Sequence, residues 1–156
     1  MLLHHKELSV RLTGFYDSVL YWDPKKDEIA NIPCLPVSAK NRSDGPDFQA
    51  PEVYGNGEKE EFDPIKADLW SFAAVIFFAV TNGGYPYDYK VDNPHVEKEI
   101  RDNVNGLDIS EHGKSFLAAL LNTNAMARLT FDKINKQHWF DMLERKNVVC
   151  SQTKVA

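Results

Sequence analysis

The segment RLTGFYDS at residues 11–18 places a carboxylate, Asp17, just beyond a predicted strand and the glycine turn at Gly14. Phosphate-handling enzymes use an aspartate at such a corner because carboxylate oxygens are ligands that Mg²⁺ prefers. Asp17 is therefore the first residue to consider for metal-dependent chemistry. The histidines offer no alternative metal site, since the five in the chain show no paired spacing beyond the adjacent His4-His5.

The composition favours a single domain that works in the cytoplasm. At 156 residues with 43% hydrophobic content, the chain has the size and the apolar side chains for one core. A net charge of −5, with no Lys/Arg run longer than Lys25-Lys26, argues against nucleic acid as a partner, because phosphate binding needs clustered cations. Cys34 and Cys150 lack metal-type spacing, so we expect reduced thiols, with one disulfide as the alternative.

The most apolar run, LWSFAAVIFFAV at 69–80, is predicted to be a buried helix. A membrane span needs ~20 residues, so this run is too short and we expect no membrane partner. Its side chains are apolar all round, and a helix without a polar face must be packed on every side. The sequence therefore predicts that it lies at the centre of the domain. It begins at the Asp-Pro pair 63–64 or at Asp68, and it stops at the glycine pair 83–84.

Shorter elements precede and follow this helix. Residues 1–12 are typical of two strands joined by a turn, a small hairpin. The stretch from Gly14 to about Gly45 contains three prolines and shows no helical period, so a long surface loop is predicted there. Three more helices are expected after the central one, opened or capped by Asn93-Pro94, Ser110 and Thr130.

Five short motifs occur in order along the chain. They are APE at 50–52, DLWSFA at 68–73, GGYPYD at 83–88, LLNTNAMARLT at 120–130 and QHWF at 137–140. Together they resemble landmarks of the C-terminal lobe of a eukaryotic protein kinase. The resemblance implies a mainly α fold, a protein-kinase-like C-lobe over residues 1–146 with a small N-terminal β-hairpin and a central buried helix. It also implies an activation-segment-like loop at 14–49 and a flexible tail at 147–156.

The resemblance assigns an ion pair to two distant residues. In the family, the glutamate of Ala-Pro-Glu pairs with a later arginine in a largely buried position. The matching residues here are Glu52, preceded by Ala50 and Pro51, and Arg128. Taken without the motifs around them, the two side chains would be ordinary solvated surface charges.

Two further residues match the start of the family's central helix. Asp68 resembles an aspartate that hydrogen-bonds the backbone of the catalytic loop. From its position alone, Asp68 is equally a helix N-terminal carboxylate favoured by the helix dipole. Trp70 is expected in the core.

The same resemblance argues against Mg²⁺ binding by Asp17. In the family this strand ends in Asp-Phe-Gly, whose aspartate holds the Mg²⁺ on ATP. The aligned residues here are Gly14, Phe15 and Tyr16, and Asp17 lies ~10 Å further along an extended chain. The chain also lacks the family's glycine-rich loop, its lysine and its His-Arg-Asp motif. We therefore expect no catalytic, cofactor-binding or metal-binding residues, with ATP and Mg²⁺ bound only if an upstream region supplies the missing parts.

Three hypotheses about function stay open. The first is a catalytically inactive kinase-like C-lobe, a pseudokinase or kinase fragment, which acts if at all by binding protein through the 93–103 helix region or the exposed surface of the central helix. The second is the downstream part of a protein kinase, an ATP-dependent phosphotransferase, whose N-lobe and catalytic loop lie outside this chain. The third is a truncated product without function, in which the central helix is incompletely covered and promotes aggregation.

Overall fold

The computed structural model describes most of the helical part of the chain and short pieces of the rest. The described residues are 2–4, 9–11, 18, 20, 22–29, 32–36, 48–55, 60–88, 94–134 and 136–139. The chain divides into two compact units, Met1–Ala30 and Asn31–Ala156. The described structure is mainly α, since four α-helices follow a series of short strands.

The first unit begins with an antiparallel hairpin. β1 (Leu2–His4) pairs with β2 (Ser9–Arg11), and the register places Leu3 opposite Val10. β2 alternates polar and apolar residues as Ser9, Val10 and Arg11, a pattern typical of strands. The hairpin predicted over residues 1–12 is confirmed.

A second hairpin lies within the stretch that the sequence predicts to be irregular. β3 (Trp22–Asp23) pairs antiparallel with β4 (Glu28–Ile29). The turn between them uses Asp27 in a left-handed conformation, with φ 57°, which aspartate tolerates better than most residues. The prediction of an irregular loop is therefore wrong for residues 22–29.

The second unit opens with strands of two residues each. β5 (Ile32–Pro33) pairs antiparallel with β8 (Glu61–Phe62), and β6 (Leu35–Pro36) pairs in parallel with β7 (Tyr54–Gly55). Proline is tolerated in such short ladders because it sits at an edge where no donor is required. β7 directly follows the 3-10 helix η3 (Pro51–Val53). The predicted loop is thus paired here as well.

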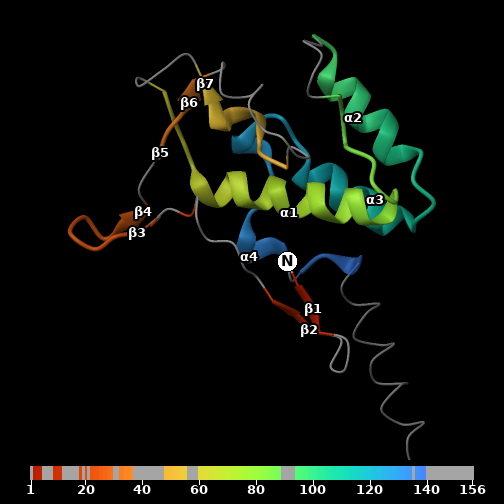
Figure 1. Ribbon diagram of the computed structural model, residues 1–156, viewed down its shortest axis with the longest axis horizontal. Coiled ribbons are helices and arrows are strands. Elements are labelled where there is room, and N and C mark those ends of the chain that lie inside the picture. Colours follow the sequence, from red (N-terminus) through yellow and green to blue (C-terminus); the bar gives the residue numbers. More distant parts are fainter. Residues whose placement is uncertain are drawn as a thin grey trace, which may run out of the picture. The chain divides into compact units, whose positions relative to one another are not determined.

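α1 (Pro64–Val80) is the long helix that runs through the second unit (Figure 1). Its N-terminus is capped by Asp63, whose carboxylate accepts hydrogen bonds from the backbone N–H groups of Ile65 and Lys66, at 2.9 and 3.2 Å. Of the two starts left open by the sequence, the helix uses the Asp-Pro pair. Asp63 supplies the acceptor that the first turn needs, and proline at the first position has no N–H to satisfy.

α1 ends at a turn built around Thr81. The hydroxyl of Thr81 donates to the carbonyl of Phe77, at 2.8 Å, and accepts from the backbone N–H of Gly84, at 2.9 Å. Asn82 and Gly83 then take positive φ values of 56° and 112°, which prevents the helix from continuing. The predicted stop at the glycine pair is confirmed.

α1 is buried along one side only. Its buried apolar residues are Ala67, Leu69, Trp70, Ala73, Ala74 and Phe77. Phe72 and Val80 keep exposed fractions of 43% and 44%. The prediction that this helix is packed on every side is therefore wrong for the described residues, because the elements of the second unit that pack on it cover one face. No helix in the described part of the chain is long and apolar enough to cross a membrane.

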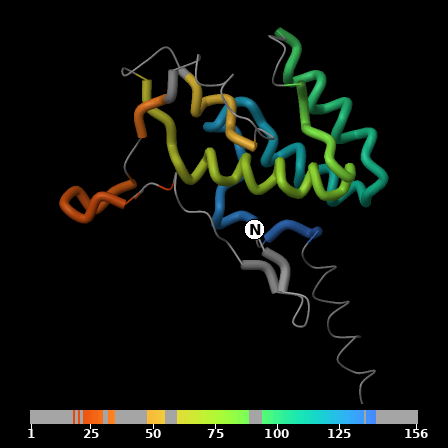
Figure 2. The backbone as a smooth tube through the Cα atoms, in the orientation of Figure 1, coloured from red at the N-terminus to blue at the C-terminus, as the bar shows by residue number. Residues whose placement is uncertain are grey.

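Three shorter helices complete the second unit. They are α2 (Val96–Asn105), α3 (Glu111–Leu120) and α4 (Phe131–Ile134), with the 3-10 helix η4 (Ala125–Ala127) between the last two. α3 contacts both α1 and α2 (Figure 2). The core that these helices share contains Ile100, Val104, Phe116, Leu117, Leu120 and Ile134 beside the buried face of α1.

The predicted starts of α3 and α4 agree with the structure, and that of α2 does not. Ser110 caps α3 as predicted, with its hydroxyl oxygen accepting from the backbone N–H of Gly113 at 3.2 Å. α2 begins at Val96 rather than at the predicted Asn93-Pro94, and His95 in front of it makes no side-chain cap. α4 directly follows Thr130, as predicted, and extends over only four residues.

Candidate functional site

The predicted pairing of Glu52 with Arg128 is present in the structure. Two guanidinium nitrogens of Arg128 donate to the two carboxylate oxygens of Glu52, Nη1 to Oε1 at 2.6 Å and Nη2 to Oε2 at 3.0 Å. This is a bidentate pair, the arrangement in which an arginine holds a carboxylate most firmly. Arg128 is 2% exposed, so removing Glu52 would leave a buried cation without its counter-charge.

Backbone carbonyl groups satisfy the remaining donors of Arg128. Nε and Nη2 donate to the carbonyl of Asn122, at 3.1 and 2.9 Å, and Nη1 also donates to the carbonyl of Lys66, at 2.5 Å. The guanidinium lies 5.1 Å from the ring centroid of Trp70, where the negative ring face attracts a cation. Lys66 returns the contact, since its ammonium donates to the carbonyl of Arg128 at 2.9 Å. We call Glu52, Lys66, Trp70, Asn122 and Arg128 the arginine network.

The arginine network joins three parts of the second unit that are distant in sequence. Glu52 belongs to η3, Lys66 and Trp70 belong to α1, and Asn122 and Arg128 flank η4. Every described donor of the guanidinium points to protein acceptors, which leaves it fixed rather than available to a substrate. The network therefore supports the fold and positions η3.

The backbone around Glu52 is also held by burial and by a hydrogen bond from Cys34. Ala50 is fully buried, and Pro51 occupies the first position of η3. The thiol of Cys34 donates to the carbonyl of Glu52 at 3.2 Å. Burial raises the pKa of the Cys34 thiol, and the nearby carboxylates of Glu60 and Glu52 raise it further. Cys34 is therefore a protonated structural thiol rather than a nucleophile.

Asp68 lies in the second turn of α1, not at its start. The first turn of α1 carries no acidic residue, so the interpretation of Asp68 as a first-turn carboxylate is wrong. Its side chain is exposed, yet partial burial raises the pKa of its carboxyl group. Within the described residues it makes no hydrogen bond that would offset this desolvation. Asp68 is thus an exposed carboxylate that is partly desolvated by its neighbours on α1.

Gly14, Phe15, Tyr16 and Asp17 lie outside the described residues, as does the predicted tail at 147–156. The comparison of this corner with Asp-Phe-Gly therefore stays a prediction. Among the residues that the structure does describe, no group of three or more His, Cys, Asp or Glu side chains could hold a metal ion.

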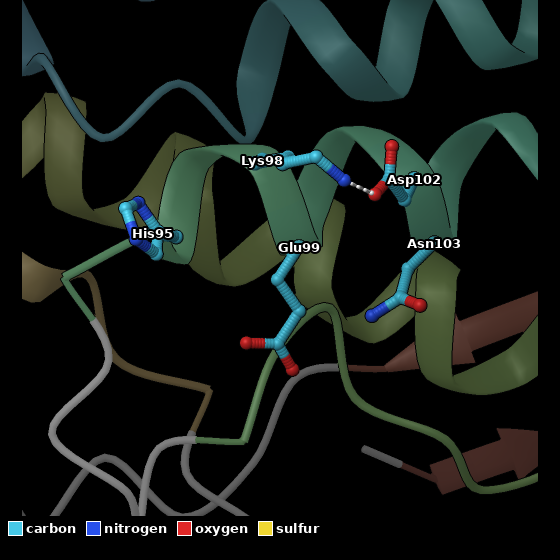
Figure 3. Close-up of a pocket in the computed structure, with 5 residues that line it drawn as sticks. All are labelled: His95, Lys98, Glu99, Asp102 and Asn103. Carbon is cyan, nitrogen blue, oxygen red and sulfur yellow. Dashed lines mark hydrogen bonds and ion pairs between the residues drawn. The ribbon is translucent and has the colours of Figure 1, made fainter.

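The polar face of α2 lines an open hollow of about 320 Å³ (Figure 3). The lining residues are His95, Lys98, Glu99, Asp102 and Asn103. Lys98 and Asp102 form an ion pair at 2.6 Å across one helical turn. No nucleophile in this set stands beside a base in the arrangement that acyl or phosphoryl chemistry requires.

Two side chains of α2 also fasten the GGYPYD segment. Glu99 accepts a hydrogen bond from the backbone N–H of Asp88 at 3.0 Å, and the amide of Asn103 donates to the carbonyl of Pro86 at 3.0 Å. Tyr87 of the same segment packs its ring against Trp70, with the centroids 6.2 Å apart. The segment thereby connects α2 to the arginine network through Trp70.

The sequence did not indicate one contact between ionisable side chains. His112 and His138 lie far apart in the chain, yet their rings meet with centroids 4.5 Å apart. Spacing along the sequence can reveal two histidines only when both lie on the same helix or strand. This pair depends on two segments that tertiary packing brings together.

Comparisons with known proteins agree with the kinase-like motifs. The chain is 26% identical over 127 residues to CBL-interacting protein kinase 20 of Oryza sativa subsp. japonica, which covers 75% of this chain and 26% of that protein. It is 30% identical over 96 residues to CBL-interacting serine/threonine-protein kinase 7 of Arabidopsis thaliana, or 61% of this chain and 21% of that protein. The chain is related to protein kinases. It spans about a quarter of the length of these curated relatives, and no protein-family model matches it.

Replacing Arg128 by alanine should destabilise the protein far more than replacing Arg101, which is exposed and lies outside the network. Removing one member of a buried pair strands the other charge and costs about 3–5 kcal/mol, whereas an exposed substitution changes the free energy of unfolding by less than ~0.5 kcal/mol. Urea unfolding of Arg128→Ala and Arg101→Ala measures the difference. If Arg128→Ala no longer folds, Arg128→Lys keeps a charge but loses the bidentate geometry and should still be clearly destabilised. Equal effects at positions 128 and 101 would contradict the assignment.

Replacing Asp68 by asparagine should raise the free energy of unfolding near neutral pH. The pKa of Asp68 is higher in the folded state than the ~3.9 of an unfolded chain, so ionisation of this carboxyl group favours unfolding. As the pH falls below the ~3.9 of the unfolded chain, the carboxyl group becomes protonated in both states, and the advantage of the variant should fade. Chemical unfolding of both proteins across this pH range measures the difference. A difference that is independent of pH, or that grows as the pH falls, would contradict the desolvation of Asp68.

Proposed function

We propose that this chain is a kinase-like C-lobe that does not itself transfer phosphate and that acts by binding another protein. The observation that carries the proposal is the arginine network, which joins the Ala-Pro-Glu segment to α1 and η4 through Glu52 and Arg128. The relationship to protein kinases supports it from the sequence side. The kinase-like scaffold is thus retained around residues whose role is to hold structure.

The absence of phosphoryl transfer follows from the chemistry that this reaction needs. Phosphoryl transfer depends on charges positioned around the phosphates, including a metal-holding aspartate. By resemblance, Gly14 stands in place of that aspartate, and a glycine offers no oxygen to Mg²⁺ from its side chain. Arg128, the most buried cation of the described residues, is fully engaged with protein acceptors.

We place the protein-binding surface on the polar face of α2. Its side chains Lys98, Glu99, Asp102 and Asn103 are ordered by contacts to the helix itself and to the GGYPYD segment (Figure 3). Side chains that are already fixed lose less conformational entropy when a partner binds. The mixed charges suit a partner of complementary polar surface, with the exposed apolar face of α1 around Phe72 as a second candidate surface.

A second function has its own support. The relatives are named as protein kinases, and the chain corresponds to about a quarter of each. The chain could therefore be the downstream part of an ATP-dependent phosphotransferase whose nucleotide-binding parts are supplied elsewhere. The sequence of the transcript upstream of Met1 separates the two proposals, since a glycine-rich loop and a His-Arg-Asp motif there would favour the enzyme.

ATP with Mg²⁺ should not raise the thermal transition of the purified chain. A ligand present at about 100 times its dissociation constant stabilises a protein by about 2.7 kcal/mol, so binding would be visible. Differential scanning fluorimetry with and without Mg²⁺ tests this, with an active protein kinase as the positive control. Size-exclusion chromatography must show a folded monomer, because a chain that aggregates would support the non-functional alternative. A reproducible stabilisation that requires Mg²⁺ would overturn the proposed lack of nucleotide binding.

Reversing charges on α2 should weaken partner binding without unfolding the chain. Lys98→Glu with Arg101→Glu changes two exposed positions on α2, and Lys133→Glu with Lys136→Glu makes the same charge change at exposed positions of the α4 region. Cross-linking in cells followed by mass spectrometry should recover partners with the wild type and the α4 variant but not with the α2 variant. Because rim charges act mainly on association rates, added salt should weaken the same complex. Loss of partners in the α4 variant alone would place the surface elsewhere.

A further inference from the structure

Two imidazole rings meet on the surface of the second unit, and neither residue belongs to the arginine network or lines the hollow on α2. His112 lies in the first turn of α3, and His138 lies in the helical turn at 138–139. The ring centroids are 4.5 Å apart and the ring planes cross at 89°. Both residues are exposed to solvent, so ions can reach them.

The position of this pair is set by the neighbouring aromatic contact. Trp139 packs on Phe116 of α3, with ring centroids 5.1 Å apart, and this seats the turn at 138–139 against the helix. Gly113 permits the close approach. A Cβ atom at Gly113 would lie 3.1 Å from Cδ1 of Ile109 and 3.4 Å from Nε1 of Trp139, tighter than most real contacts. Gly113, which follows His112, thus leaves room for Trp139, which follows His138, to pack against α3.

We propose that His112 and His138 form a two-imidazole site for a divalent first-row transition-metal ion such as Ni²⁺, Cu²⁺ or Zn²⁺. Imidazole nitrogen is a preferred ligand for these ions. Metal–nitrogen bonds of about 2.0–2.1 Å place two nitrogens of one ion roughly 3 Å apart. Exposed rings whose centroids are 4.5 Å apart can present their nitrogens at that separation after a rotation of the side chains.

The number of side-chain ligands determines whether this metal site is open or closed. Among the described residues no group of three or more His, Cys, Asp or Glu side chains gathers here, so this part of the chain offers the ion two imidazole ligands. The site is therefore an open surface clamp that links the turn at 138–139 to α3, rather than a closed structural centre. Because the ion binds the folded arrangement, it should stabilise the docking of this turn.

Isothermal titration of the untagged full chain with Ni²⁺ tests the site. We expect one ion bound per chain, with a rise in the thermal transition. His112→Ala and His138→Ala should each weaken binding by at least ~10-fold, and Gly113→Ala should weaken it by ~10-fold while both imidazoles remain, because it disturbs their positions. The controls are His95→Ala, and the double change of His4 and His5 to alanine; both should bind as the wild type does.

Two results would overturn the proposal. One is unchanged Ni²⁺ affinity in His112→Ala and in His138→Ala, provided that circular dichroism shows each variant folded. The other is loss of binding when His4 and His5 are replaced, which would place the ion at the N-terminal pair. Electron paramagnetic resonance of the Cu²⁺-loaded chain supplies a separate readout: coupling to two imidazole nitrogens is expected, and the loss of one coupling in His138→Ala.

Discussion

The second unit of this protein depends on keeping one buried guanidinium satisfied. Arg128 is almost fully removed from water, and burying a charge is costly unless it is paired and hydrogen-bonded. Glu52 neutralises it, while carbonyl groups of Lys66 and Asn122 take the other donors. These acceptors come from three separate segments, so the arrangement of η3, α1 and the chain around η4 is fixed by a single side chain. If that side chain loses its partners, the unit loses a polar connection between η3 and its helices, and the shared apolar core around Ala50 and Val53 is left to join them.

This constraint is compatible with the proposal that the kinase-like scaffold works without kinase chemistry. The arginine network uses residues that hold the fold, and Gly14 is not one of them. The GGYPYD segment joins the network through the contact of Tyr87 with Trp70, and α2 is fastened to the same segment. A surface on α2 is thereby supported by the buried network.

Features set by local chemistry could be predicted from the sequence. The capping of α1 by Asp63 and of α3 by Ser110 follows from a side-chain acceptor placed before an apolar helix, and the end of α1 follows from its glycine pair. The pairing of Glu52 with Arg128 came from the order of the motifs, since no local pattern links residues so far apart. Local rules and motif order together gave the framework of the second unit.

Features that depend on tertiary context could not be predicted. Strands of two residues, such as β3 and β5, are too short to show an alternating pattern. The apolar composition of α1 predicted burial on all sides, but composition does not say which neighbours are present, and Phe72 remains exposed. The contact of His112 with His138 arises from the docking of Trp139 on α3, which no spacing rule contains.

A double-mutant cycle on Glu52 and Arg128 tests the central role of the ion pair most directly. The free energy of unfolding is measured by urea denaturation for the wild type, Glu52→Gln, Arg128→Met and the double variant. The cycle cancels the loss of the bonds to Lys66 and Asn122, which both Arg128 variants share, and leaves the coupling between the two charges. Our account predicts a coupling toward the upper end of the ~0.5–3 kcal/mol range found for residues in contact. A coupling near zero would show that the pair does not hold the unit together.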